Sequence, residues 1–168
     1  MQSTTSQRCQ THSIHVRCTL NDLHHLRKGC RMSDYLKPLP KIDELNQAHW
    51  RGAQQGRLMV QQCIQCNSYR YPFKKMCTDC HSTEVDWKQV SGKGSIWSWC
   101  VFHRPYFKGF EAERPYNVVL VELDEGIRIY SNLVGVKKSE IHIGMRVKAC
   151  FDAVTSAVTL VKFEKDST

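Results

Sequence analysis

The chain has 168 residues, 41% of them hydrophobic, which is enough to bury the core of one ordinary domain or two small ones. No apolar run approaches the roughly 18 residues that a membrane-spanning helix needs, so the composition predicts a soluble protein. The net charge is +8, but half of it lies in residues 1–31. The remainder is therefore only mildly basic, which weakens a nucleic-acid-binding interpretation.

Residues 1–31 show no lasting helical or strand period, and we expect them to be disordered or a non-native extension. Three interpretations compete for this segment. Its arginines and near absence of acids resemble a mitochondrial presequence, its histidines suit weak metal binding, and Met32 opens a stretch typical of a natural start. We favour a start codon placed too early and assign no role to the four histidines, which are His12, His15, His24 and His25.

Residues 32–57 predict a helical arm. Pro38 and Pro40 favour an extended lead, and Gly56 is placed to end a helix in the left-handed conformation. Spacings of three and four make a short amphipathic stripe between these points. The helix either packs on its own domain or docks on a partner chain, and the stripe residues are Ile42, Leu45, His49 and Trp50, with Ala53 following.

Residues 58–86 predict a metal-binding ribbon. Cys63 and Cys66 are followed after ten residues by Cys77 and Cys80. Each C-x-x-C pair presents two thiolates from one tight turn, and two such turns form the tetrahedron that Zn²⁺ accepts. Both pairs are followed by a residue where positive φ is useful, and there we find Asn67 and His81 in place of glycine. The expected miniature core comprises Tyr69, Tyr71, Pro72 and Phe73.

Four cysteines close a metal site, so we expect a structural role for this one. Structural zinc is preferred, although iron in the same cage would give a one-electron carrier like rubredoxin. The chain has nine cysteines but shows no signal peptide, which favours a reducing cytoplasm over a disulfide scaffold. Cys100 and Cys150 lie inside apolar runs and are expected to be buried and inert.

Residues 87–165 predict a small barrel of five strands. The strand runs are 95–102, 116–123, 127–134, 145–152 and 157–164, with Gly92 and Gly94 marking a bend before the first. Simple alternation places Trp97 and Trp99 on one strand face. A long, coiled first strand followed by four others describes a Greek-key barrel such as the OB-fold, with a small sandwich as the alternative. The predicted class is mostly β.

Residues 35–163 resemble a family of acyl-CoA-associated proteins that carry an N-terminal helix, a rubredoxin-like zinc ribbon and a C-terminal OB-fold. The resemblance rests on the order and spacing of "KPLP", "HWRGAQQGRL", the cysteine ribbon, "VSGKGSIWSW", "HRPYFKGFEAERPYNVVLVELDEGIRIYSNLVG" and "IHIGMRV". Two departures stand out. His49 replaces the usual aromatic residue before the tryptophan, and His81 replaces the usual glycine.

The resemblance implies a non-catalytic accessory subunit. Members of this family assist thiolase-like enzymes, aldolases or hydratases that act on acyl-CoA thioesters in lipid or steroid metabolism, and the partner carries the nucleophile. The resemblance therefore implies a hetero-oligomer.

The loop after the first barrel strand is the richest candidate surface. Its basic residues suit the phosphates of coenzyme A, and its aromatic residues suit an acyl chain or a partner enzyme. A solvated loop with tucked aromatic residues is the alternative. The candidate residues are His103, Arg104, Tyr106, Phe107, Lys108 and Arg114, with Phe110 beside them.

Independent catalysis has little support. Cys100 and His103 are the one tempting nucleophile and base, and a thiol in an apolar strand is usually inert. No glycine-rich phosphate loop, serine elbow or paired acid motif appears. The alternative class is a nucleic-acid-binding module made of a ribbon and an OB-fold. The acidic residues interleaved in the barrel sequence argue against this alternative.

Overall fold

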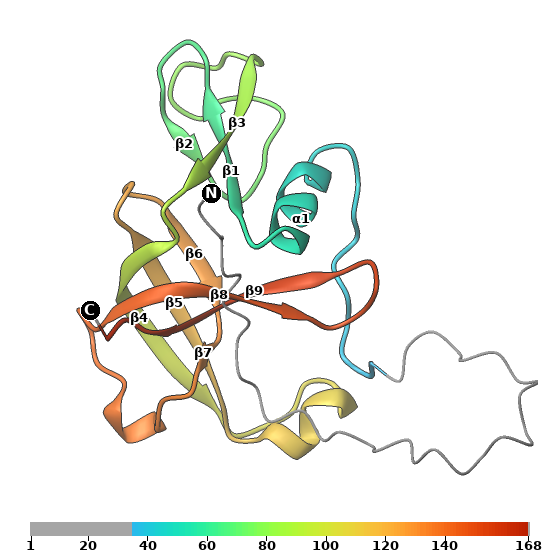
Figure 1. The fold of residues 1–168 in the computed structure, drawn as a ribbon, viewed down its shortest axis with the longest axis vertical. Coiled ribbons are helices and arrows are strands. Elements are labelled where there is room, and N and C mark those ends of the chain that lie inside the picture. The colour runs from blue at the N-terminus through green and yellow to red at the C-terminus, as the bar shows by residue number, and fades with distance from the viewer. Residues whose placement is uncertain (1–34, 168) are drawn as a thin grey trace, which may run out of the picture.

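The structure is a computed structural model, and it describes residues 35–167. The interpretations offered above for residues 1–31 lie outside the described residues. The described chain is an N-terminal helix and a three-stranded ribbon above a six-stranded sheet (Figure 1). Within the described part, no helix has the length and apolar character needed to cross a bilayer.

The helix is shorter than the predicted stripe. Helix α1 spans Gln47–Gln54, so Ile42 and Leu45 precede it. The Asp43 carboxylate accepts a hydrogen bond from the Leu45 N–H at 3.0 Å, and the Asn46 side chain accepts one from the Asp43 N–H at 3.0 Å. Such local side-chain bonds compete with helical hydrogen bonding, which delays the start of the helix.

Helix α1 packs on its own chain. The buried face of the helix therefore follows the first of the two interpretations, packing on its own domain. His49, Gly52 and Ala53 are buried on that face. A Cβ on Gly52 would lie 2.3 Å from the Met59 side chain. The helix therefore approaches strand β1 (Leu58–Cys63) more closely than a side chain at this position would permit. His49 is 3% exposed and therefore does not belong to a docking stripe.

The ribbon is a small antiparallel sheet. Its strands are β1, β2 (Tyr69–Arg70) and β3 (Val85–Val90), in the order β2-β1-β3. The base of the ribbon is continuous with the barrel, because Leu58, Val60 and Val90 belong to the same buried cluster as the barrel residues. The ribbon is therefore anchored at one end by apolar packing.

The remaining strands form one six-stranded sheet in the order β6-β5-β4-β8-β9-β7. All five predicted strand runs are present, and the third is divided at Asn132 into β6 and β7, of which β7 pairs with β9 in parallel. The strands are β4 (Lys93–Phe102), β5 (Tyr116–Leu123), β6 (Arg128–Ser131), β7 (Leu133–Val134), β8 (Arg146–Ala153) and β9 (Thr159–Lys165). Two 3-10 helices, η1 (Lys108–Glu113) and η2 (Lys138–Glu140), lie in the connections.

A bulge in β4 overturns two expectations. The β4–β5 register shifts between Ile96 and Ser98, which leaves Trp97 as the extra residue. Ile96 is buried and Trp99 packs on the core, whereas Trp97 is 47% exposed, so the prediction that the two tryptophans share a face is wrong. The same shift turns Cys100 outward, and this thiol is exposed rather than buried.

One close approach and one side-chain clamp fix the relative positions of the barrel strands. Gly94 lies directly against β5, and a Cβ there would sit 2.3 Å from the Glu122 carbonyl oxygen. Asn117 donates its side-chain N–H to the Leu133 carbonyl at 2.8 Å and accepts the Leu133 N–H at 2.7 Å. This clamp fixes β7 at the point where the third run divides.

The close approach at Gly94 makes a direct prediction. The Gly94→Ala substitution should lower the free energy of unfolding by about 3 kcal/mol, because the added methyl group forces β4 away from β5. Urea denaturation of the metal-loaded chain measures this, with Ser95→Ala as the matched control. A loss below about 0.5 kcal/mol for Gly94→Ala would show that the strands are not in close contact.

Candidate metal centre and partner surface

The two C-x-x-C turns have the same backbone hydrogen bonds. The Asn67 N–H donates to the Cys63 carbonyl at 2.9 Å, and the His81 N–H donates to the Cys77 carbonyl at 3.2 Å. The N–H of each first cysteine donates in return to the carbonyl five residues on, at 2.9 and 2.8 Å. Asn67 has φ of 60° and His81 has φ of 61°, which confirms the expectation for the residue after each pair.

The four cysteine sulfurs form a compact cluster. The Sγ atoms of Cys63 and Cys80 are 3.5 Å apart, those of Cys66 and Cys77 are 3.6 Å apart, and all four lie within 4.8 Å of one another. Four sulfurs at about 2.3 Å from one tetrahedral Zn²⁺ lie about 3.8 Å apart, so the cluster fits such a metal. Within residues 35–167 this is the single histidine, cysteine or carboxylate group with that arrangement, and His81 is outside it.

The pKa values of three thiols in the cluster are shifted, and not all in the same direction. The backbone N–H of Cys66 lowers the pKa of Cys63, and the Ser68 hydroxyl lowers the pKa of Cys66. The backbone N–H of Ser82 also lowers the pKa of Cys80, but hydrogen bonds to the other thiols together with burial raise it to about 12. The metal-free chain therefore keeps a proton on Cys80 at neutral pH, and metal binding must displace it.

Aromatic side chains support the ribbon from below. Phe73 lies 5.0 Å from the His49 ring, 5.1 Å from the Trp87 ring and 5.2 Å from the Tyr71 ring, measured between centroids. Tyr71 and Phe73 of the predicted miniature core are in this cluster, whereas Tyr69 packs against the main hydrophobic core and Pro72 is exposed. The aromatic cluster joins the loop between the two C-x-x-C turns to helix α1.

His49 is a neutral member of this aromatic cluster. Its Nδ1–H donates to the Met59 carbonyl oxygen at 2.8 Å, since a carbonyl can only accept. Burial lowers the pKa of His49 below its ordinary value of 6.5, and the hydrogen bond to Met59 offsets part of that effect. His49 therefore packs as an aromatic side chain does and, like one, carries no charge.

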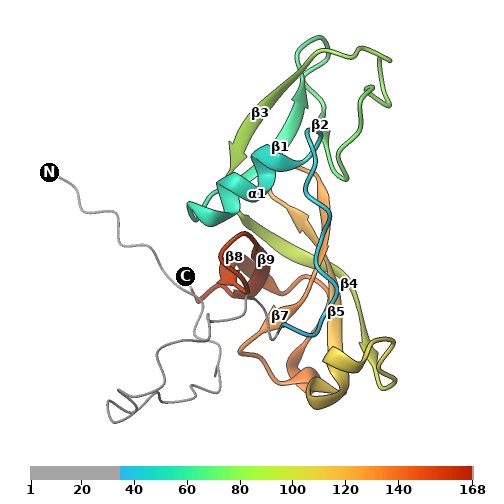
Figure 2. The same ribbon diagram turned by 90° about the vertical axis from the view of Figure 1, so that its right-hand side faces the viewer.

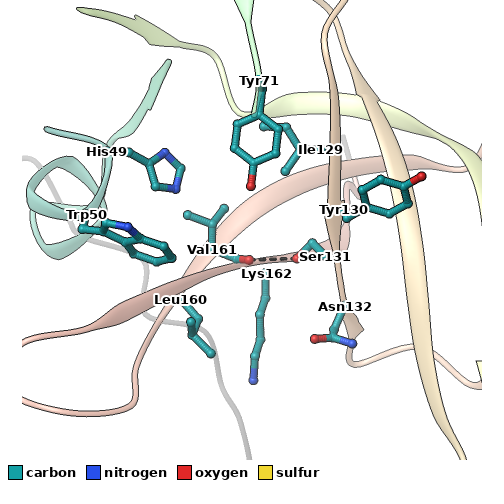
Figure 3. A pocket seen from close by; sticks show the side chains of 10 residues that line it. All are labelled: His49, Trp50, Tyr71, Ile129, Tyr130, Ser131, Asn132, Leu160, Val161 and Lys162. Carbon is teal, nitrogen blue, oxygen red and sulfur yellow. Dashed lines mark hydrogen bonds between the residues drawn. The ribbon is translucent and has the colours of Figure 1, made fainter. Parts of the chain in front are cut away.

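A small pocket opens between the helix and the barrel. It has a volume of about 190 Å³ and lies between Trp50 on α1, Tyr71 on the ribbon and Val161 on β9. Figure 3 shows the Tyr71 hydroxyl pointing into this space toward Val161, whose carbonyl accepts the Ser131 hydroxyl at 2.8 Å. The Trp50 Nε1 is buried without a hydrogen-bond partner in the described chain. Sequence reasoning missed this pocket, because its walls come from four separate segments.

The extended lead before α1 lies against the loop after β4. A Cβ on Gly109 would come within 2.6 Å of the Leu36 backbone, and Lys37 pairs with Glu113 and lies 4.9 Å above the Phe110 ring. Figure 2 shows the lead running down the barrel from α1 toward η1. The lead that precedes the helix therefore packs on the loop that carries the second candidate surface.

The predicted loop residues divide into a packed set and an exposed set. Phe110 stacks on Tyr116 at 4.8 Å, and Tyr116 stacks on Phe102 at 5.3 Å. The six candidates are exposed, namely His103, Arg104, Tyr106, Phe107, Lys108 and Arg114.

The pocket beneath the loop is lined by other residues. It has a volume of about 260 Å³, and none of the six candidates lines it. Its lysines include Lys37 and Lys162, which sequence reasoning missed. Burial lowers the pKa of Lys162, but its hydrogen bond to Asp152 at 2.6 Å and the attraction of nearby acidic groups together outweigh burial and raise the pKa. Two of the pocket's cations are thus already paired with carboxylates.

Comparison with known proteins identifies both modules. Residues 50–86 match the family model described as the ChsH2 rubredoxin-like zinc ribbon domain, and residues 87–152 match the ChsH2 C-terminal OB-fold domain. A DUF35 domain-containing scaffold protein of Methanocaldococcus jannaschii is 32% identical over 65% of this chain and 78% of its own length. The chain belongs to this DUF35 family. The mostly β prediction with an OB-fold is therefore confirmed.

Other relatives are parts of larger proteins or complexes. A chain of the solved structure named Ltp2-ChsH2(DUF35) aldolase superimposes with a TM-score of 0.69 at 36% identity, covering 76% of this chain and 98% of that chain. A probable enoyl-CoA hydratase alpha subunit of Thermomonospora curvata is 40% identical over 67% of this chain. This chain covers 34% of the length of that subunit.

The cysteine cluster predicts how metal content responds to mutation. Cys77→Ser should abolish stoichiometric metal binding and unfold the ribbon, because three thiolates and a hydroxyl bind far more weakly than four thiolates. Elemental analysis of the purified chain measures the metal, and Cys100→Ser, a thiol outside the cluster, is the matched control. Full metal retention in Cys77→Ser would contradict the assignment.

Burial of neutral His49 predicts a pH effect on stability. The unfolded chain takes up a proton near the ordinary pKa of 6.5, whereas the folded chain resists protonation until lower pH. The free energy of unfolding should therefore fall as pH drops from about 7.5 to about 5.5, and His49→Phe should fall less over that range. Chemical denaturation at each pH measures this, with exposed His142→Gln as control. Equal losses in wild type and His49→Phe would refute the argument.

Proposed function

We propose that this chain is a non-catalytic accessory subunit of a thiolase-like enzyme, aldolase or hydratase that acts on acyl-CoA thioesters. Its family supports this, because relatives carry the names of scaffold proteins and of hydratase subunits. The match to 98% of one chain of an aldolase assembly supports a hetero-oligomer with a catalytic partner. Lipid or steroid metabolism is the proposed setting.

The closed cysteine cluster is the observation that carries the proposal. The four sulfurs would take all four positions of a tetrahedral metal, which would leave no open position for substrate or water. Zinc in a structural role suits this ligand set and the zinc ribbon family, whereas iron is the less favoured occupant. Cys100 and His103 share no hydrogen bond in the described chain, and the nucleophile is assigned to the partner.

The proposed docking surface is the lead–loop face, which we define as Leu36, Leu39, Tyr106 and Phe107. These side chains are 78%, 41%, 71% and 55% exposed. Exposed apolar side chains gathered on one face mark an interaction site, and aromatic residues dominate such contacts. Ile42, at 40% exposure, extends the face toward helix α1.

Basic side chains border this face. His103, Arg104 and Lys108 are exposed and lie in the same loop, and Arg114 lies 3.8 Å from Glu111. We propose that they meet acidic groups of the partner or the phosphates of a bound acyl-CoA at the edge of the interface. Charged groups at an interface rim affect association rate and specificity more than affinity.

Paired substitutions on the lead–loop face test the proposal. The chain is used as an affinity bait in nuclease-treated native extract, and bound proteins are identified by mass spectrometry. We expect near-equal recovery of a thiolase-like enzyme, aldolase or hydratase, and at least about a tenfold drop for the Leu36→Ala, Phe107→Ala double variant.

The control is Ile143→Ala, which removes an exposed apolar side chain located before β8. It should leave recovery of the partner unchanged. Recovery of no acyl-CoA enzyme, with nucleic acid bound in untreated extract instead, would contradict the accessory role. Equal recovery by the double variant would contradict the assignment of the docking surface to the lead–loop face, but not the accessory role.

A further inference from the structure

A pocket of about 320 Å³ lies where the ribbon meets the turn between β5 and β6. Its ribbon wall comes from residues 69–72 with Lys74 and Thr78, and its barrel wall comes from residues 126–128. The pocket shares no residue with the lead–loop face. A single group bound in this pocket would contact both the ribbon and the barrel.

Arg70 is the unusual member of this pocket. It is 4% exposed, and none of its three guanidinium nitrogens has a hydrogen-bond partner in the described chain. Its backbone pairs with Gln61 on β1, but the Gln61 side-chain oxygen accepts the Lys74 N–H at 3.1 Å. A buried guanidinium has five N–H donors, and leaving it unpaired is costly, so a counter-charge is required.

The pocket wall offers positive charge and no negative charge. Lys74 is exposed and has no ion pair among residues 35–167, and no carboxylate is among the described lining residues. Arg128 also lines the pocket, but Glu122 pairs with it at 3.0 Å and Trp97 lies 3.6 Å beneath it. Two cations, on Arg70 and Lys74, are therefore left without an acidic partner.

We infer that this pocket binds a phosphate-sized oxyanion between ribbon and barrel. The planar guanidinium fork of Arg70 matches two oxygens of such a group, and Lys74 and the Thr78 hydroxyl supply further donors. The volume exceeds that of one phosphate, so the pocket also admits a phosphate ester. The Arg70 nitrogens are covered in the structure, so binding requires neighbouring side chains to move.

The bound oxyanion would join the two modules. Arg70 and Lys74 belong to the ribbon and Arg128 to the barrel, so one ligand in contact with all three fixes the ribbon against the turn between β5 and β6. This inference does not rest on the proposed function, because it concerns charges inside this chain alone.

Calorimetric titration of the full, metal-loaded chain tests the inference. The probes are inorganic phosphate, glycerol 3-phosphate and acetate at matched ionic strength. We expect phosphate or its ester to bind with a dissociation constant in the range of about 1 mM or below, and Arg70→Met to weaken that binding at least about tenfold. Tighter binding of the ester than of inorganic phosphate would identify a phosphate ester as the source, and the reverse order would identify free phosphate.

Two variants and one spectroscopic readout complete the test. Lys74→Met should also weaken binding, whereas Lys75→Met, an exposed neighbour outside the pocket, should leave it unchanged. Without phosphate, Arg70→Met should melt no lower than wild type, because it removes an uncompensated buried charge. If Arg70→Met does not fold, the ¹⁵N resonance of the wild-type Arg70 side chain provides the readout. Equal phosphate affinity in Arg70→Met, acetate bound as tightly as phosphate, or an Arg70 resonance unmoved by phosphate would overturn the inference.

Discussion

The convergence of four cysteine sulfurs, all within 4.8 Å of one another, is the constraint on which the upper half of this molecule depends. The ribbon is a small sheet in which β2 has only two residues, and the loop between the cysteine turns contributes a few aromatic side chains such as Tyr71 and Phe73. A ribbon of this size depends on its metal to fold. A metal held there by all four sulfurs would have no open coordination position, which is why we propose a structural task for the site and a catalytic partner chain.

The lower half is held by apolar burial, and the two halves meet in a shared core. Leu58 and Val60 on β1 pack with Ile96 on β4 in the same buried cluster, and helix α1 lies over this junction through His49. The ribbon is therefore presented at a defined orientation on the barrel.

Local patterns predicted the elements well, and long-range contacts escaped prediction. The cysteine spacing and the positive φ of Asn67 follow from rules that act within a few residues. The bulge at Trp97 depends on register against β5, which strand alternation alone does not specify. Burial of Arg70 and the contact of Leu36 with Gly109 bring together segments with no common sequence period, so only the folded chain reveals them.

Amide hydrogen exchange, compared between the metal-loaded and metal-stripped chain, tests the structural role of the metal most directly. The account predicts that removing the metal strips protection from the ribbon segment between Cys63 and Val85 and leaves strands β4, β5, β8 and β9 protected. The apolar base of β1 should retain part of its protection. Unchanged protection across the cysteine turns, or loss of protection throughout the barrel, would contradict a metal that acts as a local structural clip.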